Sequence, residues 1–164
     1  MSKSPQGAPS VNLLAVDTAT EGCSAACLAG DKSFERYAVD PQGHSRTLLG
    51  MVEAVLAEAR LERSALDALA YDAGPGSFTG IRIGAGVAQG LALGLEKPLL
   101  AVSSLMTLAE GARREQPGCN SVLAAIDARM DQVYWARLES DPEAPGHWRW
   151  DEMPCVSEPR EVAV

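Results

Sequence analysis

The chain has 164 residues and carries 14 basic against 22 acidic side chains, which gives a formal net charge of −8. A chain of this length can bury a hydrophobic core, and its negative charge argues against unaided binding to DNA or RNA. Its four cysteines contain no Cys-x-x-Cys pair and its two histidines are far apart, so neither a zinc site nor a disulfide framework is predicted. This cysteine usage favours a reducing, cytoplasmic location.

Residues 1–11 are expected to form a disordered lead-in, because they contain no apolar core of a signal peptide or membrane span. A β-hairpin is predicted next, from Leu13 to Leu28. An apolar run rich in strand formers ends at Asp17, an acid in a tight turn with Thr18 and Thr20, and a second alternating run follows. The simplest interpretation of the Asp17 carboxylate is that it caps its own turn.

After a third predicted strand at residues 34–39, a long helix is expected over residues 45–61. Its apolar positions cover well over half of the helix circumference, which is typical of a helix that packs against more than one neighbour. These positions are Leu48, Leu49, Met51, Val52, Val55, Leu56 and Ala59. His44 is interpreted as a helix-start residue, with a metal ligand as the alternative.

The middle of the chain alternates between strands and helices. Strands are predicted at residues 66–73 and 98–102, and helices at residues 79–95 and 104–114. This alternation after an opening hairpin indicates an α/β domain with a mixed sheet.

The loop Gly74-Pro75-Gly76-Ser77 lies between a predicted strand and a predicted helix, a place where backbone amides favour anions. It lacks the Lys-Ser/Thr pair of a P-loop and the third glycine of a dinucleotide-binding fingerprint. Neither histidine is placed to activate Ser77, so nucleophilic catalysis by Ser77 is not expected.

The glycine-rich helix at residues 79–95 contains interior glycines that each cost about 1 kcal/mol relative to alanine. Rows of small residues at i, i+4 spacing let a second backbone approach closely and offset that cost. One row is Gly80, Gly84, Ala88 and Ala92, and the other is Gly86, Gly90 and Gly94. The polar positions Arg82, Gln89 and Glu96 recur every seven residues, so we expect the remaining surface to be buried, in its own lobe or against another protein.

Two alternatives apply to this helix. A buried central helix without any interface explains the small residues equally simply. A membrane span is not predicted, because the apolar part is short and both Arg82 and Gln89 interrupt it.

The opening hairpin recurs between Leu123 and Leu138, with Asp127 in the place of Asp17, 110 residues later. The repeat predicts two lobes that begin with the same acid-tipped hairpin, divided near residue 118. We therefore expect a first lobe over residues 12–118 and, over residues 119–164, a hairpin at 121–138 with an irregular tail. A lone two-stranded hairpin is marginally stable, so Tyr134 and Trp135 must pack against the first lobe, another chain or further sequence.

Four segments together resemble the TsaB (formerly YeaZ) family of bacterial proteins, which are needed to make threonylcarbamoyladenosine in tRNA. They are Asp17-Thr18-Ala19-Thr20, His44-Ser45-Arg46-Thr47-Leu48-Leu49, residues 73–94 and Ala125-Ile126-Asp127-Ala128-Arg129-Met130. The resemblance covers about residues 12–138. It implies an actin/sugar-kinase/Hsp70-like (ribonuclease H-like) fold of duplicated lobes. Family members continue past the second hairpin, so we expect an incomplete second lobe here, as in a truncated or proteolysed chain.

The resemblance also implies a role as the non-catalytic paralogue and scaffold of the transferase TsaD, joined by the small ATPase TsaE and meeting tRNA only indirectly. The catalytic paralogue holds a metal with a His-x-x-x-His pair, whereas this chain has His44 and then Leu48, so no metal site is expected. Asp17, Thr18, Thr20 and Asp127 would lie on two degenerate phosphate loops. Because no glycine follows Asp127 in the second loop, no cofactor is expected, and weak nucleotide binding is the alternative.

We expect two helix faces to pair with the transferase, or with a second copy of this chain when the transferase is absent. The expected interface comprises Leu48, Leu49, Val52, Val55, Leu56, Gly80, Arg82, Gly84, Gly86, Gln89 and Gly90. The alternative function is a stand-alone enzyme, either a kinase-like ATPase that uses Asp17 and Asp127 or a glycoprotease-like peptidase.

Overall fold

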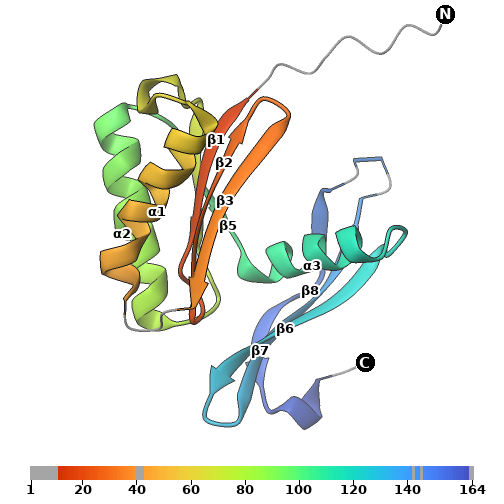
Figure 1. Ribbon diagram of the computed structural model, residues 1–164. Coiled ribbons are helices and arrows are strands. Elements are labelled where there is room, and N and C mark those ends of the chain that lie inside the picture. The colour runs from red at the N-terminus through yellow and green to blue at the C-terminus, as the bar shows by residue number, and fades with distance from the viewer. Residues whose placement is uncertain (1–10, 40–42, 142, 145, 163–164) are drawn as a thin grey trace, which may run out of the picture.

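The computed structural model describes residues 11–39, 43–141, 143–144 and 146–162, in which two β-sheets are joined through helix α3 (Figure 1). The predicted lead-in lies outside the described residues except for Val11.

The first sheet has five strands in the order β3-β2-β1-β4-β5. Their bounds are β1 (Asn12–Asp17), β2 (Gly22–Ala29), β3 (Lys32–Val39), β4 (Ala68–Asp72) and β5 (Leu99–Val102). Strands β1, β2 and β3 form antiparallel pairs because tight turns connect them, while β4 lies parallel to both β1 and β5. The predicted mixed α/β sheet is therefore confirmed.

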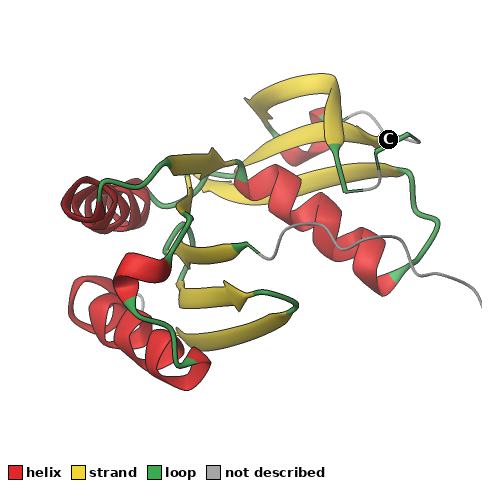
Figure 2. Ribbon diagram, turned by 90° about the horizontal axis from the view of Figure 1, so that it is seen from above, coloured by secondary structure: helices red, strands yellow, loops and turns green. Residues whose placement is uncertain are grey.

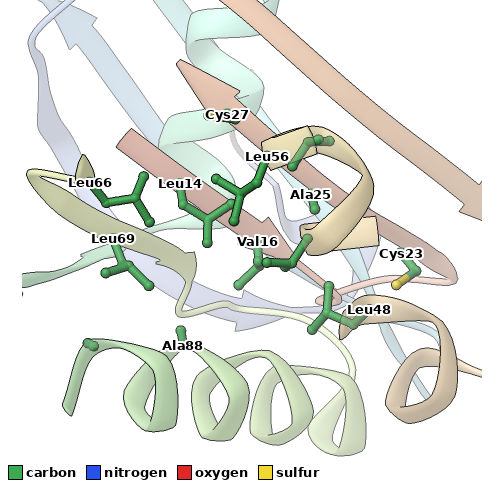
Figure 3. Close-up of a cluster of buried hydrophobic side chains, with 13 residues drawn as sticks. Leu14, Val16, Cys23, Ala25, Cys27, Leu48, Leu56, Leu66, Leu69 and Ala88 are labelled. Atoms are coloured by element: carbon green, nitrogen blue, oxygen red, sulfur yellow. The ribbon is translucent and has the colours of Figure 1, made fainter. Parts of the chain in front are cut away.

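Helices α1 (His44–Ala59) and α2 (Phe78–Leu95) pack on one face of this sheet (Figures 1 and 2). The core between this sheet and the two helices is lined by alternate residues of β1 and β2 together with one side of each helix (Figure 3). Its fully buried members include Leu14, Cys23, Cys27, Leu48, Val52, Val55, Leu66 and Leu69. A short 3-10 helix, η1 (Arg63–Ala65), leads from α1 towards β4.

The second sheet has three strands, β6 (Ser121–Arg129), β7 (Gln132–Ser140) and β8 (Trp148–Ser157), in that order. Helix α3 (Ser104–Glu115) packs on it and lies on the side of the first sheet opposite to α1 and α2 (Figure 2). The second core consists of Leu105 and Ala109 from α3 with Ala124, Ala136 and Leu138. Helix α3 thus packs with the second sheet. We call the first sheet with α1 and α2 the first unit, and the second sheet with α3 the second unit; these units meet at Ser103, whereas the sequence predicted a division near residue 118.

The tail was expected to be irregular, and this prediction is wrong. Strand β8 pairs antiparallel with β7, and a 3-10 helix, η2 (Pro159–Glu161), follows it. Strand β8 also provides the missing neighbour of Trp135, which is 4% exposed and donates its Nε1–H to Ser157 Oγ at 2.9 Å. The second hairpin is therefore part of a three-stranded sheet.

Helix α2 is the one helix, within the described residues, that is long and apolar enough to cross a membrane by length and composition alone. In the fold its buried residues are Gly80, Gly84, Ala88 and Ala92, of which Ala88 and Ala92 belong to the core on the first sheet.

Candidate functional site: the carboxylate turns and the outer helix face

The two copies of the hairpin contain the same local structure at their acids. Asp17 Oδ1 accepts a hydrogen bond from the Ala19 amide at 2.8 Å, and Asp127 Oδ1 accepts one from the Arg129 amide, also at 2.8 Å. A carboxylate that bonds the amide two residues later closes a local turn. Both acids therefore cap their own turns, which is the simplest of the interpretations that the sequence allowed for Asp17.

The second turn differs from the first in two respects. Its carboxylate also pairs with the Arg129 guanidinium at 3.1 Å, and the strand register shifts between Asp127 and Arg129. Asp127 thus forms an exposed ion pair within its own turn.

The loop after β1 is tightly packed against the start of α2. Thr18 is buried and donates its hydroxyl hydrogen to Gly80 O at 2.7 Å, while the Ser77 amide donates to Ala19 O at 2.6 Å. A Cβ added to Gly80 would lie 1.9 Å from Thr18 O, and one added to Gly76 would lie 2.3 Å from Ala19 O. These glycines are required because two backbones meet there.

Two amides of the same loop donate to side chains of the loop itself. Its Ala19 amide is bonded to Asp17, and the Gly22 amide donates to Thr20 Oγ1 at 3.2 Å. A phosphate cradle needs backbone N–H groups that point at the ligand. The first of the two expected phosphate loops thus uses these amides internally.

The glycine-proline loop is also engaged in local structure. Gly74 has a φ of +92°, and its amide donates to Asp72 Oδ1 at 2.7 Å; Pro75 follows it through a cis peptide bond. Ser77 is the N-cap of α2, because its Oγ accepts a hydrogen bond from the Gly80 amide at 3.2 Å. The hydroxyl of Ser77 therefore has a capping role.

Asp72 is a buried acid that the sequence reasoning missed. It is 9% exposed, and burial raises the pKa of its carboxyl group, with the negative charge of Asp17 acting in the same direction. Both acids line a cavity of about 160 Å³ between the first sheet and α3, together with Tyr71 and Thr107. The signal was present in the sequence, since Asp72 ends an apolar strand as Asp17 does.

His44 lies at the start of α1, where it is 4% exposed with Nε2 3.4 Å from Glu21 O. Among the described residues, no group of three or more His, Cys, Asp or Glu side chains is placed to hold a metal ion.

Part of the expected interface is buried inside the first unit. Leu48, Val52, Val55 and Leu56 are at most 4% exposed because they face the first sheet, and Gly80 and Gly84 face the Thr18 loop. The prediction that these six residues contact a partner is wrong. Most of the apolar circumference of α1 is covered by its own sheet and by α2, and Leu49 is the exposed exception.

The other predicted interface residues do lie on the surface, on the sides of α1 and α2 that face away from the sheet. Two apolar residues that were not predicted are also exposed on α2, namely Phe78 at 72% and Leu93 at 82%. We call this surface the outer helix face; it comprises Leu49, Gly50, Phe78, Arg82, Gly86, Gln89, Gly90, Leu93 and Gly94.

The outer helix face is open at its glycines. A Cβ added to Gly50, Gly86, Gly90 or Gly94 would meet no atom within 4 Å. At one end of α2, the Arg82 guanidinium carbon lies 3.3 Å from the centroid of the Phe78 ring, and Nη1 donates to Phe78 O at 3.0 Å. The face therefore combines an ordered cation–π pair, exposed leucines and bare helix backbone.

Comparison with known proteins places these features in a family. Residues 39–144 match the family model described as TsaD: tRNA N6-adenosine threonylcarbamoyltransferase. The chain is 46% identical over 152 residues to the tRNA threonylcarbamoyladenosine biosynthesis protein TsaB of Escherichia coli, covering 93% of this chain and 64% of that protein. It is 42% identical to the TsaB protein of Haemophilus influenzae, covering 78% of this chain and 54% of that protein.

A solved structure gives the same result. YeaZ from Pseudomonas aeruginosa superposes with a TM-score of 0.87 at 48% identity, covering 94% of this chain and 70% of that chain. The chain thus spans about two thirds of the length of that structure and somewhat less of the two TsaB proteins.

Proposed function

Since this chain belongs to the TsaB (YeaZ) family and has its actin-like, ribonuclease H-like fold, we propose that it is a non-catalytic subunit in the biosynthesis of threonylcarbamoyladenosine in tRNA. In this proposal it binds a TsaD-type transferase through the outer helix face, and a TsaE-type ATPase joins the complex. A second copy of the chain occupies the face when the transferase is absent. Contact with tRNA is made through the partners, in the cytoplasm.

The observation that carries this proposal is the open glycine row of α2. Each helix-interior glycine costs about 1 kcal/mol relative to alanine. Within the described chain there is room for a methyl group at Gly86, Gly90 and Gly94, so no internal contact requires glycine at these positions. A second helix that crosses this row could come closer than larger side chains allow. The exposed Phe78 and Leu93 would give such a contact apolar area.

The non-catalytic part of the proposal is supported by the two carboxylate turns. Asp17 and Asp127, the acids that a kinase-like enzyme would use, both accept hydrogen bonds from their own turns. The loop beside Asp17 is also pressed against α2 by Gly76 and Gly80. A nucleotide could reach the Ala19 and Gly22 amides of this loop only if these internal hydrogen bonds broke.

The test uses the helical glycines themselves. Gly86→Leu places a side chain on the outer helix face, and Gly111→Leu is the matched control, because Gly111 is an exposed glycine of α3 whose Cβ position is equally open. We expect Gly86→Leu to weaken binding to a TsaD-type transferase at least about tenfold in sedimentation or calorimetry, which corresponds to about 1.4 kcal/mol, and Gly111→Leu to leave it unchanged. Equal affinity of both variants and the natural chain would contradict the proposed surface.

The alternative, a self-sufficient ATPase or peptidase, is tested with the isolated chain. Calorimetric titration with ATP and magnesium, followed by a phosphate-release assay, should give neither tight binding nor turnover. Turnover that disappears in Asp17→Asn would favour the enzyme instead.

A further inference from the structure

The two packing units of the chain meet at a narrow junction. The core of the first unit and the core around α3 share no residue, and the described chain passes from one unit to the other at Ser103 and Ser104, between β5 and α3. Units without a large shared apolar interface usually move relative to each other. Something at the junction must therefore fix α3 if the two units are to keep one arrangement.

We propose that the Asp72 side chain is a latch that holds the start of α3 on the first sheet and thereby sets the orientation of the second unit. Asp72 ends β4 in the first unit, whereas Ser104 is the first residue of α3. The Ser104 hydroxyl donates to Asp72 Oδ1 at 2.5 Å, and both residues are buried, at 5% and 9% exposed. The hydrogen bond thus crosses directly from one unit to the other.

Two further hydrogen bonds connect Asp72 and Ser104 through Gly74. The same Asp72 Oδ1 accepts the Gly74 amide at 2.7 Å, and the Ser104 amide donates to Gly74 O at 3.0 Å. The pairing of β4 with β5 extends one residue further, because the Ala73 amide donates to Val102 O at 2.8 Å. Asp72, Gly74 and Ser104 are therefore mutually bonded, and this arrangement allows α3 little freedom to tilt.

The position of α3 has a consequence for the cavity between the units. That cavity, of about 160 Å³, is lined by Asp17 and Tyr71 on the first sheet and by Thr107 on α3. Thr107 lies one helical turn beyond the latch. A tilt of α3 about Ser104 would change the distance between these walls, so the latch also sets how far the cavity opens. This inference is independent of the proposed partners.

The test compares the two neighbouring serines at the start of α3, the N-cap Ser103 and the first helical residue Ser104. Ser104→Ala removes the hydroxyl that bonds Asp72, while Ser103→Ala removes the N-cap hydroxyl that accepts the Leu105 amide and makes no bond to Asp72. A second pair is Asp72→Ala, which removes the acceptor, and Asp72→Asn, whose amide oxygen can still accept both bonds.

The readout is the distance distribution between two spin labels, measured by double electron–electron resonance on the whole chain. One label is placed on Cys155, an exposed residue of β8, and the other on Glu62→Cys next to η1, with Cys119→Ser to prevent further labelling; Cys23 and Cys27 are buried. We expect Ser104→Ala and Asp72→Ala to widen the distribution about twofold or shift its centre, and Ser103→Ala and Asp72→Asn to preserve it. Equal distributions within either pair would overturn the proposal.

Discussion

The glycines of α2 provide a test in which one substitution has opposite effects on two sides of the same helix. At Gly86 and Gly90 a methyl group would meet no atom within 4 Å. Alanine there should raise the free energy of unfolding by about 0.5–1 kcal/mol per site, since it lowers the entropy of the unfolded chain and favours the helix. The double variant should gain about 1–2 kcal/mol, the sum of the two sites.

Alanine at Gly80 and Gly84 should do the reverse. The new methyl carbon would lie 1.9 Å from Thr18 O at Gly80 and 2.6 Å from Thr18 Oγ1 at Gly84, well inside contact distance. The helix or the Thr18 loop must then move, and the hydrogen bond from Thr18 to Gly80 O is lost. Overpacking of this kind and one lost buried hydrogen bond together predict a loss of about 2–4 kcal/mol at Gly80.

Urea denaturation followed by circular dichroism measures both effects, with Gly111→Ala as the control for an open helical glycine elsewhere. The expected order of stability places Gly86→Ala and Gly111→Ala above the natural chain and Gly84→Ala and Gly80→Ala below it. If Gly86→Ala destabilised the isolated monomer, the outer row would be packed within the chain and the proposed surface would lose its basis. A neutral Gly80→Ala would refute the close approach of α2 to the Thr18 loop.

Further predictions concern charge and packing. Hydrogen bonds from Arg113, Arg114 and Trp148 lower the pKa of Glu110 to about 2. The ionised Glu110 should therefore contribute about 1 kcal/mol to the free energy of unfolding, the value for a partly exposed pair, fully above pH 4.5 and less and less as the pH falls towards 2. Glu110→Gln should flatten that part of a curve of stability against pH. The pKa of Asp72 is raised by burial, so its ionisation should lower stability as the pH rises above 3.8, and Asp72→Asn should remove this decline. Leu48→Ala should cost about 2–5 kcal/mol in the same urea assay and leave no binding defect at permissive temperature, because Leu48 is fully buried. Phe78→Ala should weaken binding of a TsaD-type transferase without a comparable loss of stability, since the ring is 72% exposed, and unchanged binding would remove it from the proposed surface.

Local patterns were sufficient to predict most of the elements. Periodicity located α1 and α2 to within a residue or two, because helix and strand repeats depend on neighbouring residues only. Strand β8 was missed because it contains Pro154 and the charged residues Arg149, Asp151 and Glu152. Such residues argue against a central strand but are tolerated at the edge of a sheet, and β8 is an edge strand.

The candidate site was harder to predict, since it depends on which side of each helix faces the sheet. The sequence separated the two rows of small residues in α2, yet nothing local distinguishes a row that meets Thr18 from a row that meets solvent. That choice is made by contacts over more than sixty positions along the chain, such as Thr18 to Gly80. On α1 the wide apolar surface hid the distinction between Leu48, which faces the core, and Leu49, which is 48% exposed.

The two rows of α2 can be compared as two uses of the same residue type. In the inner row, the helix-propensity cost of Gly80 and Gly84 is offset within the chain, because the missing side chains admit the Thr18 loop and its hydrogen bonds. In the outer row, Gly86, Gly90 and Gly94 together cost about 2–3 kcal/mol, a substantial fraction of the 5–15 kcal/mol by which domains are usually stable, and no contact in the described chain offsets it. A helix from another protein that packs on this row would make close backbone contacts there, as the Thr18 loop does on the inner row, and these contacts would offset the cost. The stability gained by Gly86→Ala and the affinity lost by Gly86→Leu should therefore be found at the same residue.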